Sequence, residues 1–167
     1  MTPTPGVSTV VLRSVSESAA AAIAAGGLPD DVRVAADYPT EFSVGVAASV
    51  GNDSALGPFF LHRTVDDVVV GEIGGAFVMP GTVEIGYAIV VSCWGRGYAT
   101  DAVRGLLDKA RMNPGIDRVI AHTPMDRPAS GRVLDKAGFA YLGETNDEHD
   151  GAPIRVHSWE IVLRPPE

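Results

Sequence analysis

A carboxylate and a glycine-rich turn lie close together in this sequence, and the two together could carry out group transfer. Glu84 lies on a nearly continuous apolar stretch, residues 82–91, which predicts a central strand covered on both faces. This strand leads into residues 94–100 (WGRGYAT), where a turn precedes a helix. Glycines let the backbone approach a bound group closely, and the first N–H groups of a helix point outward at it. The pattern predicts a diphosphate-bearing cofactor beside a carboxylate that could act as a base.

The same turn has two other interpretations. It could be a plain connection between a strand and a helix, or it could be a nucleotide-binding loop. The chain contains neither a Gly-x-Gly-x-x-Gly sequence nor a Walker-type loop ending in Gly-Lys-Ser/Thr, so the common nucleotide-binding patterns are absent.

Composition limits the class of protein. The chain has 167 residues, 46% of them hydrophobic and 20% charged, which fits a single globular domain. A formal net charge of −8 argues against a general affinity for nucleic acid. We expect a cytoplasmic protein that does not bind membranes, because no apolar run reaches the ~20 residues of a membrane span and the N-terminus lacks signal-peptide features. A single cysteine, Cys93, excludes an internal disulfide and a thiolate zinc cluster.

The elements predicted around the turn alternate between strands and helices. Residues 1–7 are expected to be flexible and residues 8–165 to form one domain. Strands are predicted over residues 8–13, 59–62, 68–73, 82–91, 118–121, 140–143 and 154–163. Helices are predicted from Ser16 to Gly26, from Pro39 to about Val50, from Gly97 to Asn113 and from Pro128 to Gly138. Glycines at 71, 74 and 75 predict a bulge or close approach, and residues 144–151 are expected to be an acidic loop. This order predicts a mixed α/β sheet with helices packed on it.

The order and the motifs resemble the GNAT superfamily of N-acetyltransferases, and within it the branch around RimJ and RimL. The family's cofactor motif is Arg or Gln, two variable residues, Gly, one variable residue, and Gly or Ala. It aligns with residues 94–99, with Trp94 at the first position. Residues 127–139 resemble the family's Asn-x-x-Ser helix ending in Gly-Phe, with Arg127 where Asn is usual. The resemblance implies a GNAT-like mixed α/β fold, with a central, mostly antiparallel sheet of about six to seven strands and four flanking helices.

The resemblance also implies acetyl-CoA as the cosubstrate and no metal. The diphosphate would lie on the glycine turn, and the end of the central strand would offer backbone groups to the pantetheine arm. Arg96 could neutralise a phosphate or be only a solvated turn residue, and the guanidinium of Arg127 could reach a phosphate or a carbonyl. The cofactor-binding residues expected on this basis are Ile89, Val90, Val91, Arg96, Gly97, Tyr98, Ala99, Thr100 and Arg127.

Two residues are candidates for catalysis. An amine arrives as an ammonium ion and must lose a proton before it attacks a thioester, and Glu84 could take that proton directly or through water. Glu84 could instead pair with a neighbouring strand or bind the charge of the substrate. Many relatives carry a Tyr as proton donor four residues before the Gly of the Gly-Phe pair, where this chain has Leu134. Ser130 is an alternative donor, although a hydroxyl there could also bond within the first helical turn.

The acceptor site is the least determined part. Asp37, Tyr38 and Glu41 lie in the region that shapes the acceptor site in similar enzymes, and helix capping or a surface position is equally open for them. The acceptor is expected to be a protein N-terminus or a small-molecule amine, and the protein a monomer or a homodimer. The alternatives are a non-catalytic acyl-CoA-binding module and an acyltransferase that uses a larger donor such as succinyl-CoA. Cys93 is expected to be packed rather than to act as a nucleophile.

Overall fold

The computed structural model describes residues 8–51, 56–149 and 151–165, so the prediction for residues 1–7 lies outside it. Within the described residues, seven strands form one sheet with four α-helices and a short 3-10 helix around it. In chain order the elements are β1 (Val10–Ser14), α1 (Glu17–Ala24), α2 (Ser43–Ser49), β2 (Leu56–Arg63), β3 (Val69–Met79), β4 (Thr82–Ile89), the 3-10 helix η1 (Val91–Cys93), α3 (Tyr98–Arg111), β5 (Arg118–Pro124), α4 (Pro128–Lys136), β6 (Ala140–His149) and β7 (Ala152–Val162).

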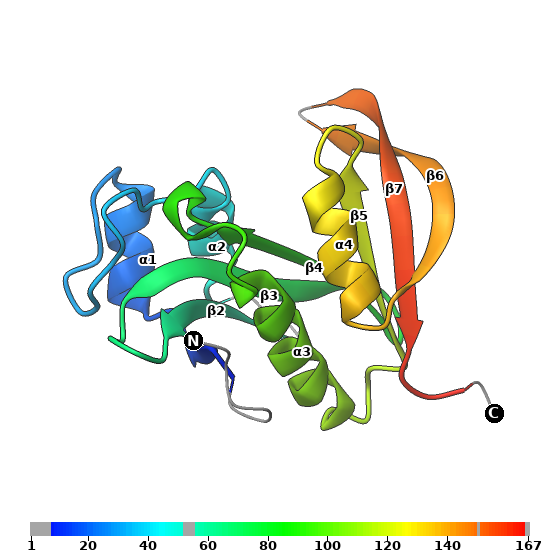
Figure 1. The fold of residues 1–167 in the computed structure, drawn as a ribbon, viewed down its shortest axis with the longest axis horizontal. Helices are drawn as coiled ribbons and strands as arrows, with labels where there is room; N and C mark the ends of the chain where they lie inside the picture. The colour runs from blue at the N-terminus through cyan, green and yellow to red at the C-terminus, as the bar shows by residue number, and fades with distance from the viewer. Residues whose placement is uncertain (1–7, 52–55, 150, 166–167) are drawn as a thin grey trace.

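The strands follow the order β1-β2-β3-β4-β5-β7-β6 across the sheet. Among these named strands, β4 and β5 are the only parallel neighbours, and their pairing covers just Thr82–Glu84 and Arg118–Ile120. Beyond Glu84 the two strands part, and Figure 1 shows β2, β3 and β4 running to the left while β5, β7 and β6 stand on the right. The prediction of a mixed α/β, mostly antiparallel sheet with four helices is confirmed.

Contacts of β4 show which helices cover each face of the sheet. Side chains alternate along a strand, so Glu84 and Gly86 share one face and Ile85 and Tyr87 share the other. A Cβ added at Gly86 would lie 2.8 Å from the ring of Phe42, directly before α2, so this is the face on the side of α2. The hydroxyl of Tyr87 donates a hydrogen bond of 2.9 Å to the backbone carbonyl of Ser130 in α4. Tyr87 therefore lies on the side of α4. We call the face of Glu84 and Gly86 the α2 face, and the face of Ile85 and Tyr87 the α4 face.

Two of the predicted glycine contacts explain how β3 fits against β4. A Cβ at Gly71 would lie 2.1 Å from the carbonyl oxygen of Ala88, and one at Gly75 would lie 2.7 Å from the side chain of Val83. Larger side chains would therefore push the two strands apart. The register between β2 and β3 also shifts beside Gly71, between Leu61 and His62, so the predicted close approach and bulge are confirmed.

The helix after the glycine turn is the element that the sequence predicts most directly. Its apolar residues recur at a spacing that places them on one side of α3, where they are buried against the sheet. The buried residues are Ala102, Val103, Leu106, Leu107 and Ala110. The first helix is likewise confirmed, because the side chain of Ser16 accepts a hydrogen bond of 3.1 Å from the backbone N–H of Ala19.

The prediction of an acidic loop at residues 144–151 is wrong. Residues 144–149 belong to β6, which pairs with β7 from Glu144 opposite His157 to His149 opposite Ala152. Their polar side chains remain compatible with a strand because Arg155 on β7 lies opposite Asn146 and hydrogen-bonds to it at 3.1 Å, while its other nitrogen contacts Glu144 at 3.4 Å.

The strands predicted over residues 59–62, 68–73 and 118–121 are longer in the structure, as Leu56–Arg63, Val69–Met79 and Arg118–Pro124, and two other predicted boundaries shift next to the glycine turn and α2. The second helix begins at Ser43 rather than Pro39, because the side chain of Ser43 accepts a hydrogen bond of 3.0 Å from the backbone N–H of Thr40 and fixes a turn there. The central strand ends at Ile89 rather than Val91, because the chain tightens into η1. Val91 therefore lies in η1, beyond the end of β4, and its side chain is exposed.

A fully buried carboxyl group, that of Glu72, fastens the segment before α2 to the sheet. Its side chain accepts hydrogen bonds from the hydroxyls of Tyr38, Ser43 (2.6 Å) and Thr40 (3.1 Å). Burial raises the pKa of Glu72 above its usual value, while the three hydroxyl donors oppose this shift. Three residues of this one segment are thereby tied to one residue of β3.

We expect Glu72→Ala to lower the free energy of unfolding by about 2–4 kcal/mol, because it leaves buried hydroxyls without an acceptor. Glu72→Gln keeps an acceptor oxygen and should cost less than about 1 kcal/mol. A raised native pKa makes the contribution of Glu72 largest in acid and smaller as pH rises through that pKa. The stability of wild type relative to Glu72→Gln should therefore decline from acid to neutral pH in urea titrations. Equal losses in the free energy of unfolding for Glu72→Ala and Glu72→Gln would contradict the stabilising role of this hydrogen-bond network.

Candidate active site

The glycine turn opens the N-terminus of α3 to the outside of the protein. Gly95 and Gly97 have φ angles of +74° and +82°, and a Cβ added at either would meet no other atom within 4 Å. Gly97 is the N-cap of this 14-residue helix, and no side chain caps it. The first backbone N–H groups of α3, from Tyr98 to Thr100, therefore have no acceptor within the helix. Together with the exposed Arg96, these donors could hold an anionic group.

The turn is held in place from the segment before α2. The carboxylate of Asp37 accepts hydrogen bonds from the backbone N–H of Ser92 at 2.9 Å and from its hydroxyl at 2.7 Å. These bonds hold the pKa of Asp37 below its usual value. Asp37, which the sequence suggested for the acceptor, thus contacts Ser92, directly before the glycine turn.

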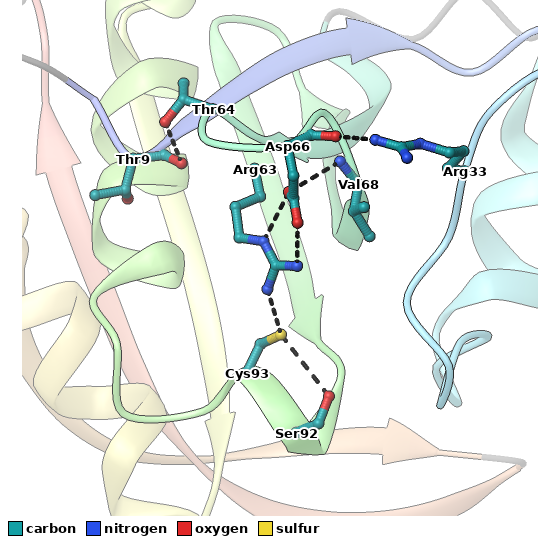
Figure 2. A network of polar contacts seen from close by, with 8 residues as sticks. All are labelled: Thr9, Arg33, Arg63, Thr64, Asp66, Val68, Ser92 and Cys93. Atoms are coloured by element: carbon teal, nitrogen blue, oxygen red, sulfur yellow. Dashed lines mark hydrogen bonds and ion pairs between the residues drawn. The ribbon is translucent and has the colours of Figure 1, made fainter.

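Cys93 belongs to a second support of the same turn. Figure 2 shows its sulfur between the hydroxyl of Ser92, at 3.8 Å, and the guanidinium of Arg63, at 3.7 Å. Arg63 also makes two hydrogen bonds to the carboxylate of Asp66, at 2.9 and 2.6 Å. The cysteine is buried, and these contacts fit the expected packed position.

Several backbone groups at the end of β4 already have partners. The carbonyl of Ile89 accepts a hydrogen bond of 2.7 Å from the indole N–H of Trp94, which stands at the unusual first position of the cofactor motif. The N–H of Val90 donates to Val70, and its carbonyl accepts from Cys93, both at 2.9 Å. A carbonyl has two lone pairs, so those of Ile89 and Val90 could each accept a further bond.

Glu84 lies beside two residues that the sequence analysis did not single out. Its Oε1 is 2.6 Å from Nδ1 of His122 on β5, and the same nitrogen is 3.9 Å from a carboxylate oxygen of Asp147 on β6. Pairing of β4 with β5 places Glu84 opposite Ile120, so His122, two residues further on, shares the α2 face. The pairing register of β4 and β5 would have indicated His122 as a neighbour of Glu84. Asp147 was missed because it lies in the stretch predicted to be a loop. The three donor groups lie within 4.8 Å of one another and could also surround a cation.

The α4 face carries the expected hydroxyl. Ser130 lies in the first turn of α4, and its backbone carbonyl accepts the hydrogen bond from Tyr87. Leu134, at the position where relatives carry a Tyr, is completely buried. Burial also raises the pKa of Tyr87, which keeps its phenol protonated. Tyr87 thus bridges β4 and α4 near the point where β4 and β5 separate.

Arg127, expected near the cofactor, contacts Glu41, expected near the acceptor. Their charged groups form an ion pair of 2.6 Å between the N-terminus of α4 and the segment before α2, and this pair raises the pKa of Arg127. Both side chains are largely exposed, so the pair contributes little to stability. Tyr38 is 4% exposed and donates to Glu72, so its side chain lies in the core.

Comparisons with known proteins agree with this arrangement. A family model described as "Acetyltransferase (GNAT) domain" matches residues 10–140. The chain is 28% identical over 102 residues to the uncharacterized N-acetyltransferase p20 of Bacillus licheniformis, and the match spans 59% of this chain and 57% of that relative. None of the helices among the described residues is long and apolar enough to cross a membrane.

Solved structures share the fold at low sequence identity. A GNAT-family acetyltransferase from Bacillus anthracis is 16% identical, with a TM-score of 0.67 over 93% of this chain and 95% of that one. A chimera of the spermidine N-acetyltransferase of Vibrio cholerae with hSSAT is 15% identical, with a TM-score of 0.67 over 93% of this chain and 96% of that one.

Proposed function

The chain belongs to the acetyltransferase (GNAT) family, and we propose that it transfers an acetyl group from acetyl-CoA to a primary amine. The observation that carries the proposal is the separation of β4 from β5 directly after Glu84. The uncapped turn before α3 lies at one end of this opening, and the carboxylate lies on the α2 face beside it. A thioester entering between the strands could meet an amine bound on that face.

In this proposal the diphosphate of acetyl-CoA binds the N–H groups of residues 97–100, with Arg96 adding positive charge. The pantetheine arm would follow the end of β4 and bond to backbone groups of Ile89, Val90 and Val91. Arg127 would leave Glu41 to contact the cofactor. Ser130 is the candidate proton donor to the departing thiolate, and the hydrogen bond from Tyr87 on β4 to its backbone carbonyl supports a place beside the opening.

The amine would attack the thioester directly within a ternary complex. Glu84 assists the loss of a proton from the ammonium ion, so that the nitrogen lone pair can attack the carbonyl carbon. The tetrahedral intermediate then expels the CoA thiolate, and the amide is left on the acceptor. Cys93 takes no part, because its sulfur is buried and contacts Arg63 and Ser92.

The acceptor class is the finer part of the proposal. Resemblance to the RimJ and RimL branch favours a protein N-terminus, and small amines such as polyamines are accepted on the same scaffold. Glu84 and Asp147 add negative charge to the α2 face, which suits any cationic amine. Fold alone does not choose among these acceptors.

We would test the function by measuring thiol release from acetyl-CoA with a panel of N-terminal peptides, spermidine and an aminoglycoside. Release with one class, accompanied by an acetylated product in mass spectrometry, is the expected result. Tight binding of acetyl-CoA without release for any amine would contradict catalysis and favour the binding-module alternative. Thiol release from succinyl-CoA but not from acetyl-CoA would mean that the acyl donor is the larger thioester. The reaction would still be acyl transfer to an amine.

A further inference from the structure

We infer that the proton of the amine is taken by Nε2 of His122, and that Glu84 orients this imidazole and stabilises its charged form. The inference rests on the proposed acetyl transfer and assigns one of its steps to particular atoms. It makes His122 the catalytic residue of the pair and Glu84 its positioning partner.

The first argument is the position of His122 relative to the opening. Ile120 is the last residue of β5 that pairs with β4, and His122 is the next residue on the same face. Its ring therefore lies beyond the end of the strand pairing, on the side where the amine would bind. Its side chain is 21% exposed, which allows a substrate to reach the ring.

The second argument is the hydrogen bond that fixes the ring. At 2.6 Å, Nδ1 of His122 and Oε1 of Glu84 must share one proton. An ionised carboxylate only accepts hydrogen bonds, so the neutral imidazole must carry its proton on Nδ1. Nε2 is then an unprotonated acceptor, and it has no hydrogen-bond partner among the described residues. A histidine oriented in this way by a carboxylate is a general base in other acyl-transfer sites.

Acidic side chains from β4 and β6 lie close to the ring of His122. Glu84 comes from β4, Asp147 from β6, and the ion pair of Arg118 with Glu160 (3.5 Å) lies further along the same face on β5 and β7. The two carboxylates near the ring attract a cationic amine toward it, and Arg118 on this face is already paired with Glu160.

The proton leaves the amine before the C–N bond forms. Nε2 accepts one proton from the ammonium, and the freed lone pair forms the C–N bond to the thioester carbon. The C–S bond then breaks, and its electron pair leaves with the CoA sulfur. The second proton of the attacking nitrogen neutralises the thiolate by way of the Ser130 hydroxyl, which gives up one proton and takes another, and the imidazolium returns its proton to solvent.

The tautomer can be tested without an acceptor by 15N NMR of the imidazole in the full-length protein. The neutral ring of His122, identified by loss of its signals in His122→Asn, should carry its proton on Nδ1. A neutral ring protonated on Nε2 would overturn the inference, whether or not acetyl transfer has been observed.

The variant His122→Asn distinguishes a general base from a residue that only positions the substrate. It is assayed with the amine that the acceptor panel identifies. The asparagine amide can still donate to Glu84 but cannot take a proton. We expect kcat to fall about 100-fold at neutral pH and to recover as pH rises and the amine arrives deprotonated, with unchanged acetyl-CoA affinity. His157→Asn, on the α4 face, is the matched control and should retain full activity. If His122→Asn keeps the wild-type kcat at every pH, Nε2 is not the base, although acetyl transfer by the wild type would still stand.

Discussion

Replacing Gly97 with valine should weaken acetyl-CoA binding by about 100-fold or more in isothermal titration calorimetry. The open space around Gly97 is the place proposed for the diphosphate, and a branched side chain there would occupy it. Loss of even two charge-assisted hydrogen bonds from the backbone, at about 1.5–3 kcal/mol each, is enough for this effect. The thioester would also lose its anchor, so kcat/KM should fall with the affinity.

Backbone strain must be separated from this steric effect, because valine is unfavourable at a φ of +82°. Gly26 provides a matched control: it follows α1, has the same φ of +82°, and would likewise meet no atom within 4 Å with a Cβ. Gly26→Val should reduce the melting temperature about as much as Gly97→Val and keep acetyl-CoA affinity. Wild-type affinity in Gly97→Val would show that the cofactor turn is misplaced.

The sequence predicted best where a short stretch of chain determines its own structure. The apolar spacing in α3, the Ser16 cap and Pro128 at the start of α4 are local signals, and the structure has each of them. Local signals failed at β6, where a polar, acidic stretch gave no strand pattern. Its pairing with β7, including the contacts of Arg155, is a tertiary effect that overrides local propensity.

Side-chain partners from distant segments were harder to predict than the elements that carry them. Glu84 was identified as a candidate base from its place before the glycine turn, but its contact with His122 depends on the register of β4 and β5. Tyr38 lay near the expected acceptor region, yet its burial follows from the acceptor that Glu72 provides inside the core. Such pairs require knowledge of which strands are neighbours, which a single sequence does not contain.

Glu84→Gln should lower kcat about 100-fold while leaving acetyl-CoA affinity nearly unchanged. The amide oxygen of Gln can still accept the hydrogen bond from His122, so the geometry is kept while the negative charge is lost. The change lies on the α2 face, away from the turn that is proposed to bind the diphosphate. Steady-state rates and calorimetry on the same preparation would measure the two effects separately.

The pH dependence decides what the carboxylate does. If Glu84 assists deprotonation, the deficit of Glu84→Gln should shrink at high pH, because the amine then needs no base. Glu160→Gln removes a different carboxylate from the same face, where Glu160 pairs with Arg118, and should retain kcat. A wild-type kcat for Glu84→Gln across the pH range would leave the carboxylate with a structural role alone. A deficit that is constant with pH would instead mean that the charge of Glu84 binds the ammonium group without helping to remove its proton.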